Sequence, residues 1–174
     1  MIGSVIAALI ANFPLTCLVL GLLVAVAAIL RLPAPRGAAA VVDRLLAWHV
    51  FFVVGVSNLV NFVFHVFFGE MTARFIGWAD SPFQFEVGTA SLGFAVVGFV
   101  AAFRSFDLRL AAILGPSFFL LGAAAGHVYQ MVTAGNFAPG NAGVIFWMDI
   151  ATPLIGFTLL ALQHRFRATA TASS

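Results

Sequence analysis

Five long apolar stretches dominate this chain, and each is about as long as a helix that crosses a membrane. The predicted spans are residues 3–30, 45–68, 84–103, 109–133 and 143–163. About 20 helical residues cover the roughly 30 Å hydrocarbon core of a bilayer. Only 8% of the residues are charged, against about a quarter in a typical soluble domain. The sequence therefore predicts an all-α integral membrane protein that forms a single transmembrane domain over residues 1–174.

The arginines between the spans predict an orientation. Seven of the eight arginines fall between spans one and two, between spans three and four, or after span five, and only Arg74 falls on the other side. Because positively charged loops remain in the cytoplasm, we expect a multi-pass protein of the cell membrane with its N-terminus outside and its C-terminus in the cytoplasm. We expect the segment between spans two and three, residues 69–86, to form a short helix in the outer membrane–water interface. Trp78 lies in this segment, and tryptophan is favoured at that depth.

Four predicted spans each carry one ionisable group at a similar depth. These groups are His65, Glu86, His127 and Asp149. Each lies within roughly 5–10 Å of the predicted outer end of its helix. A charged group facing lipid is unfavourable, so ionisable residues in such helices face the bundle interior or a wet cavity and mark functional sites. We therefore expect these four groups to meet in one polar pocket near the outer face.

Polar neighbours extend this predicted pocket by one helical turn. Asn61 precedes His65 by four residues, and Gln130 follows His127 by three. Residues at these spacings share one face of a helix. Asn61 and Gln130 are therefore candidates to orient a water molecule or a substrate beside the four ionisable groups.

Two imidazoles and two carboxylates are suitable ligands for a transition metal such as iron, zinc or manganese. The predicted metal ligands are His65, Glu86, His127 and Asp149, with Glu86 and Asp149 as candidate catalytic acid–base groups. Haem held by His65 and His127 is a less favoured alternative. Two further interpretations stay open: a hydrogen-bonded network that only joins the helices, and a proton or substrate pathway.

The leading functional hypothesis is a membrane metalloprotein, either an oxidoreductase or a hydrolase, that acts on an apolar small molecule from the outer leaflet. Whether it is an enzyme stays open at this point. The alternatives are a small proton-coupled transporter and an accessory subunit of a larger membrane complex. A homo-oligomer is also open, because the GAAAG motif at residues 122–126 predicts close packing on a helix of this chain or of a second copy. The chain has eight dispersed arginines and no lysine, which excludes a nucleic-acid-binding surface. The expected partner of the apolar spans is the lipid bilayer.

Three stretches carry a resemblance to a known group of proteins. They are FHVFFGEMTARFIGWADSPFQFEVGTASLGFAVVG at residues 64–98, GHVYQ at 126–130 and GNAGVIFWMDI at 140–150. Together they resemble a family of small bacterial integral membrane proteins of unknown function, over residues 55–160. The resemblance implies a five-helix membrane protein, and it assigns no catalytic residue. The predicted location is the bacterial inner membrane.

Overall fold

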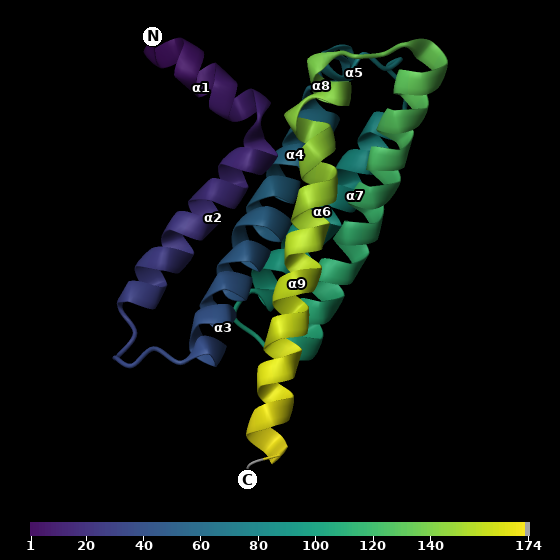
Figure 1. The fold of residues 1–174 in the computed structure, drawn as a ribbon. Coiled ribbons are helices and arrows are strands. Elements are labelled where there is room, and N and C mark those ends of the chain that lie inside the picture. The colour runs from purple at the N-terminus through teal and green to yellow at the C-terminus, as the bar shows by residue number, and fades with distance from the viewer. Residues whose placement is uncertain (173–174) are drawn as a thin grey trace.

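The computed structural model describes residues 1–172, and every regular element in these residues is a helix (Figure 1). Within this part of the chain five segments are long and apolar enough to cross a membrane. They are Phe13–Leu30, Ala38–Phe67, Phe83–Ala101, Phe106–Ala134 and Pro139–Thr169. The predicted all-α architecture with five apolar spans is therefore confirmed.

The helices follow one another in a bundle with short connections. The N-terminal half contains α1 (Ile2–Ala11), α2 (Phe13–Leu30), α3 (Ala38–His49), the π-helical segment η1 (Val50–Val56), α4 (Ser57–Phe67) and α5 (Gly69–Ile76). The C-terminal half contains α6 (Phe83–Ala101), α7 (Phe106–Ala134), α8 (Pro139–Ala142) and α9 (Val144–Ala172). The short helices α5 and α8 lie together at one end of the bundle, opposite the C-terminus (Figure 1).

The predicted span over residues 3–30 is divided into two helices, α1 and α2. The backbone leaves helical geometry at Asn12, where φ is −115° and ψ is 35°, and Pro14 lies in the first turn of α2. Proline lacks an N–H group and fits the first turn of a helix, where that group has no partner, so a new helix begins there. As a result α1 has no buried residue and projects away from the bundle (Figure 1).

The C-terminal ends of α2, α5 and α7 are stabilised by an arginine and two glycines. Arg36 donates from Nε and Nη2 to the carbonyls of Ile29 and Leu30, at 2.9 and 3.0 Å, and so satisfies the C-terminal end of α2. Gly77 and Gly135 end α5 and α7 with positive φ angles of 77° and 61°, a conformation that glycine adopts without strain. These two glycines turn the chain back over the same end of the bundle.

The apolar core lies toward the opposite end. Its buried members are Leu46, Val50, Val54, Ala101, Ala102, Ala112, Ile113 and Leu160. Beside them Arg109 of α7 pairs with Asp43 of α3 at 2.7 Å, and Asp43 also accepts a hydrogen bond from Gln163 at 3.1 Å. This end of the bundle is therefore closed by close packing, and the cavity described below lies toward α5 and α8.

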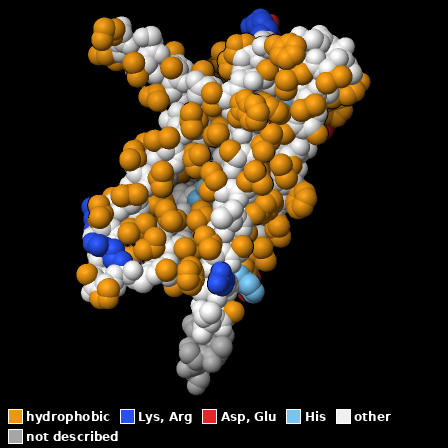
Figure 2. Space-filling view, in the orientation of Figure 1, with side chains coloured by type: hydrophobic (Ala, Val, Ile, Leu, Met, Phe, Trp, Pro, Cys, Tyr) orange, Lys and Arg blue, Asp and Glu red, His pale blue; other side chains and the backbone are white. Residues whose placement is uncertain are grey.

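The outer surface is mostly hydrophobic, as Figure 2 shows for one face. Large apolar side chains such as Leu23, Val100 and Phe118 are more than half exposed. Contiguous apolar surface of this kind is unusual for a protein that faces water, and it suits contact with lipid.

Helix α6 and η1 approach each other closely at two glycines. A Cβ atom placed on Gly98 would lie 2.6 Å from the backbone nitrogen of Gly55. Glycine at both positions therefore allows this contact. η1 leads directly into Ser57 and Asn58, which line the cavity described next, and π-helical turns are frequent beside functional sites.

Candidate functional site

A cavity of about 600 Å³ lies within the bundle, at the end covered by the segment that follows α5. Its wall is mainly apolar and comes from α2, η1, α4, α6, α7 and α9. The polar residues of the wall are Ser57, Asn58, Asn61, His65, Ser81, Gln84, His127, Asp149 and Thr152. This size and this combination of apolar wall and few polar groups are typical of sites for small organic molecules.

Three of the four predicted ionisable residues line the cavity, namely His65, His127 and Asp149. The fourth, Glu86, is exposed and is not part of the wall. The physical reason is the helical repeat of about 100° per residue: Gln84, which lines the cavity, lies on the opposite face of α6 from Glu86. The prediction that Glu86 joins the pocket as a ligand or a catalytic group is therefore corrected.

The predicted metal site has no support in the structure. Within residues 1–172 no group of three His, Cys, Asp or Glu side chains lies close enough to hold a metal ion. His127 and Asp149 are in contact, but the Nδ1 atom of His65 is hydrogen-bonded to Oε1 of Gln84 on α6. The donor set of two imidazoles and two carboxylates is therefore divided among separate places.

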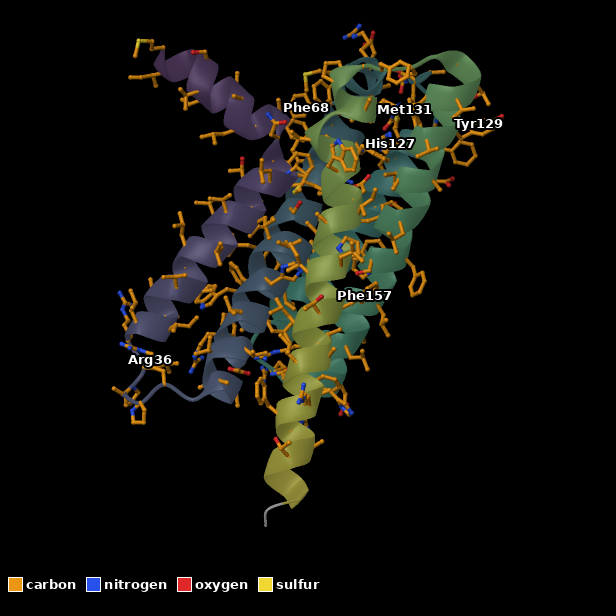
Figure 3. The ribbon with its side chains drawn as sticks, viewed as in Figure 1. Arg36, Phe68, His127, Tyr129, Met131 and Phe157 are labelled. Carbon is orange, nitrogen blue, oxygen red and sulfur yellow. The ribbon has the colours of Figure 1, made fainter. Side chains whose placement is uncertain are left out.

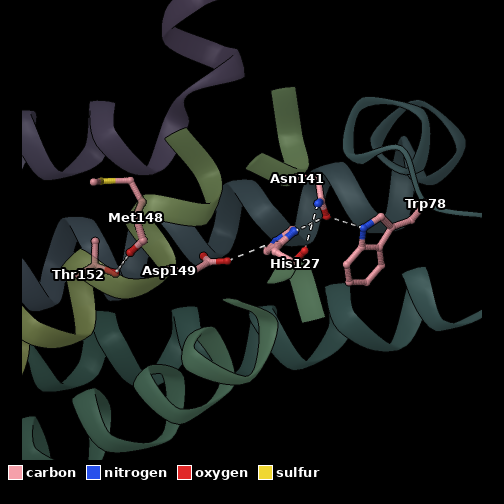
Figure 4. Close-up of polar contacts among 6 residues, drawn as sticks. All are labelled: Trp78, His127, Asn141, Met148, Asp149 and Thr152. Carbon is pink, nitrogen blue, oxygen red and sulfur yellow. Dashed lines mark hydrogen bonds and ion pairs between the residues drawn. The ribbon is translucent and has the colours of Figure 1, made fainter. Parts of the chain in front are cut away.

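His127 and Asp149 form a buried pair across α7 and α9. Their side chains are only 6% and 9% exposed, and Nε2 of His127 lies 3.5 Å from Oδ2 of Asp149. Figure 3 shows His127 within the bundle, whereas Tyr129 points away from it. On the other side of the imidazole, Nδ1 lies 2.8 Å from Oδ1 of Asn141 in α8 (Figure 4). The imidazole is therefore held between an amide and a carboxylate.

Asn141 determines which nitrogen of His127 carries a proton. Its Nδ2 donates to the backbone carbonyls of His127 and Asn136, at 3.2 and 2.8 Å, so the other end of the amide must be the oxygen. That oxygen also accepts the indole N–H of Trp78 at 2.7 Å. Because Oδ1 has no proton to give, Nδ1 of His127 must be the donor. Nε2 then faces the carboxylate of Asp149 at 3.5 Å.

Asn141 and Trp78 are the site residues that the sequence prediction omits. Asn141 is fully buried, although it belongs to a Gly/Asn/Pro-rich connection that resembles an ordinary exposed turn. Trp78 covers the imidazole of His127 with ring centroids 5.4 Å apart. The one sequence feature that could have indicated Asn141 is its place in a short turn between two membrane spans, where an amide has little access to water.

Two asparagines of the second span place amide groups on the wall. Nδ2 of Asn58 donates to the carbonyl of Val54, and Nδ2 of Asn61 donates to Oγ of Ser91, both at 2.9 Å. The predicted position of Asn61 beside the ionisable groups thus agrees with the cavity, whereas Gln130 lies outside the wall. Any role of either residue toward a substrate stays a prediction.

The cavity reaches the outside between α6 and α7. Phe83 of α6 and Phe118 of α7 both line it, and each is 69% exposed on the outer surface. A Cβ atom on Gly122 would have no other atom within 4 Å. Within this chain, therefore, the GAAAG motif does not pack closely on a neighbouring helix at Gly122. Its small residues Gly122, Ala123 and Gly126 line the cavity on this side.

The model of a family of unknown function, DUF6790, matches residues 11–169. The chain belongs to this family. Membership in DUF6790 confirms the resemblance to a family of unknown function and assigns no chemistry. Comparisons with curated proteins and with solved structures found no match. The function of this DUF6790 protein must therefore be argued from the cavity itself.

Replacing Trp78 of this DUF6790 protein by phenylalanine is expected to lower the free energy of unfolding by about 1 kcal/mol, the value of one hydrogen bond. Phenylalanine keeps an aromatic ring near His127 but removes the N–H that donates to Asn141. Thermal unfolding in a mild detergent measures the effect. Trp147→Phe is the control, because Trp147 is 60% exposed and is expected to tolerate the change. Equal melting temperatures for the two variants would contradict the role given to Trp78.

Proposed function

We propose that this protein binds a small amphiphilic molecule within the membrane. The observation that carries the proposal is a cavity of about 600 Å³ with a mainly apolar wall and a buried His127–Asp149 pair beside it. Removing such a pair from water is unfavourable, and intramembrane ionisable groups are most often functional. The polar group of the ligand would contact this pair, and its apolar part would extend past Gly122, between α6 and α7.

The proposed setting is a bacterial inner membrane, with the N-terminus outside and the C-terminus in the cytoplasm. The distribution of the arginines supports this orientation, since positively charged residues favour the cytoplasmic side. The arginines at or near the closed end of the bundle are Arg31, Arg36, Arg44, Arg104, Arg109, Arg165 and Arg167. Arg74 of α5 is at the cavity end. In this orientation α5 lies in the outer interface, and the cavity opens to the outer leaflet.

A proton-coupled carrier is the second candidate. His127 and Asp149 are in contact beside the cavity, and a pair that takes up and releases a proton in exchange for a substrate is what such a carrier requires. Transport would also need a second conformation that opens the core around Leu46 and Ile113, which are almost fully buried. Proteoliposome flux that is lost in Asp149→Asn would favour the carrier, and binding without flux would leave a binding protein. A metalloenzyme is not proposed, because the donor atoms do not converge.

Photolabelling tests the binding proposal. The protein is reconstituted in phosphatidylcholine nanodiscs and irradiated with a dodecanol that carries a diazirine, and the labelled residues are located by mass spectrometry. We expect labels on Phe119 or Met148, which line the cavity, and their loss with excess plain dodecanol. Labels confined to lipid-facing residues such as Leu23 and Val96 would overturn the proposal.

Gly122→Leu is expected to lower this cavity labelling several-fold, because the new side chain would occupy the lateral opening. It is expected to fold normally, since no atom lies within 4 Å of the added Cβ and leucine favours a helix more than glycine does. Ala125→Leu on the same helix is the control, because Ala125 is exposed and does not line the cavity. Unchanged labelling in Gly122→Leu would contradict lateral access.

A further inference from the structure

We infer that the polar group bound in the cavity is a positively charged hydrogen-bond donor, namely the ammonium of an amphiphilic primary amine. This inference rests on the proposed function and names the chemical class of its ligand. It is drawn from the direction of the hydrogen bonds around the cavity, which leaves mainly acceptor atoms free.

The amide groups of Asn58 and Asn61 both present their oxygens as the free ends. Asn58 gives its Nδ2 to a backbone carbonyl, which can only accept. Asn61 gives its Nδ2 to Oγ of Ser91, whose own proton goes to the carbonyl of Val87 at 2.9 Å. Neither amide can therefore be reversed without the loss of one of these hydrogen bonds. Both residues line the cavity, so their Oδ1 atoms remain as acceptors.

The ionisable groups of the wall add further acceptors. When Nδ1 of His65 donates to Oε1 of Gln84, Nε2 of neutral His65 carries a lone pair, and the amide N–H groups of Gln84 remain as donors on the wall. Asp149 brings a carboxylate. No lysine or arginine lines the cavity, so among the side chains of the wall only the two histidines could carry a positive charge. The wall therefore offers no fixed cation to an anionic head group, and nothing in it repels a cation when His65 and His127 are neutral.

An alkylammonium group matches this wall. It brings three N–H donors and no acceptor, and it is protonated at neutral pH as a lysine side chain is. Its charge would meet the carboxylate of Asp149, and its remaining protons would meet the oxygens of Asn58 and Asn61. Hydrogen bonds of this charge-assisted kind are about twice as strong as neutral ones, and a buried cation requires such partners.

Competition between head groups on the same chain tests the inference in the unmodified protein. Dodecylamine, dodecanol, dodecyltrimethylammonium and dodecanoate each compete with the diazirine dodecanol, and partitioning into protein-free nanodiscs corrects for membrane affinity. Dodecylamine is expected to compete at least about tenfold better than dodecanol, which corresponds to roughly 1.4 kcal/mol. Dodecyltrimethylammonium has the charge without N–H donors and is expected near dodecanol, with dodecanoate weakest.

Asp149→Asn is expected to remove most of the advantage of dodecylamine over dodecanol, whereas Ala125→Leu, on the outer face of α7, is expected to retain the ranking. Should Asp149→Asn fail to fold, the ranking in the unmodified protein still decides. Cavity labelling displaced equally well by dodecanol or dodecanoate would overturn the inference and leave the proposed function standing. Absence of cavity labelling would overturn the proposed function, and this inference with it.

Discussion

Replacing Gly98 by alanine is expected to destabilise the bundle by about 1–3 kcal/mol or more, the usual range for an overfilled core contact. The added Cβ would lie 2.6 Å from the backbone nitrogen of Gly55 and 2.9 Å from its Cα. Backbone atoms cannot move away by changing a rotamer, so α6 and η1 would have to separate. The free energy of unfolding in detergent, measured by thermal or denaturant titration, reports the loss.

Gly93→Ala is the matched control for this substitution. Gly93 lies on the same helix, and a Cβ there would have no other atom within 4 Å. Alanine favours a helix over glycine by up to about 1 kcal/mol, so Gly93→Ala is expected to be neutral or stabilising. If Gly98→Ala were as stable as Gly93→Ala, the close approach of α6 to η1 would be excluded.

The spans could be predicted because they depend on a local property, the length of an apolar run. Helix ends depend on finer backbone chemistry. Pro14 indicates from the sequence where α2 begins. The non-helical backbone angles of Asn12, which separate α1 from α2, are seen only in the structure. A hydropathy pattern averages over such a break, and for this reason it merged α1 and α2 into one span.

The site could be predicted in part, because spacing gives the depth of a residue in the bundle. His127 and Asp149 lie at similar depth on α7 and α9, which pack against each other, and they meet. Glu86 has a similar depth but points to the other face of α6. Gln84, Gly88 and Ser91 are spaced four and three residues apart, so they share one face of α6, and this face points inward. This spacing, and not the depth of a residue, indicates which side chains of α6 face the cavity.

The role of Asn141 could not be predicted from sequence. Its side chain bonds to Trp78, 63 residues away, and to His127, 14 residues away. Such contacts depend on how α8 folds over the end of the bundle, which no local pattern encodes. A buried asparagine in a turn is also indistinguishable, by composition alone, from an exposed one.

Asn141→Leu is expected to cause a large loss, with the free energy of unfolding reduced by more than about 3 kcal/mol, since each buried polar group left unpaired costs about 1–3 kcal/mol. The change leaves the N–H of Trp78, Nδ1–H of His127 and two backbone carbonyls without their partner. Leucine has a similar volume but restores none of these bonds. Hydrogen–deuterium exchange should rise in residues 76–83 and 136–143, which this side chain joins.

A control and a second substitution, Asn141→Asp, separate the structural role of Asn141 from its role toward His127. Asn12→Leu is the control, since it removes one exposed hydrogen bond to the carbonyl of Ala8 and is expected to change stability by no more than about 0.5 kcal/mol. Asn141→Asp keeps an acceptor for Trp78 and His127 but loses both amide donors. If exchange rises in residues 136–143 while the ranking of head groups persists in Asn141→Asp, Asn141 holds α8 in place without controlling the pair. If the ranking is lost in a folded Asn141→Asp protein, the neutral amide beside His127 matters for binding, because a carboxylate there favours a charged imidazole that would repel an ammonium group.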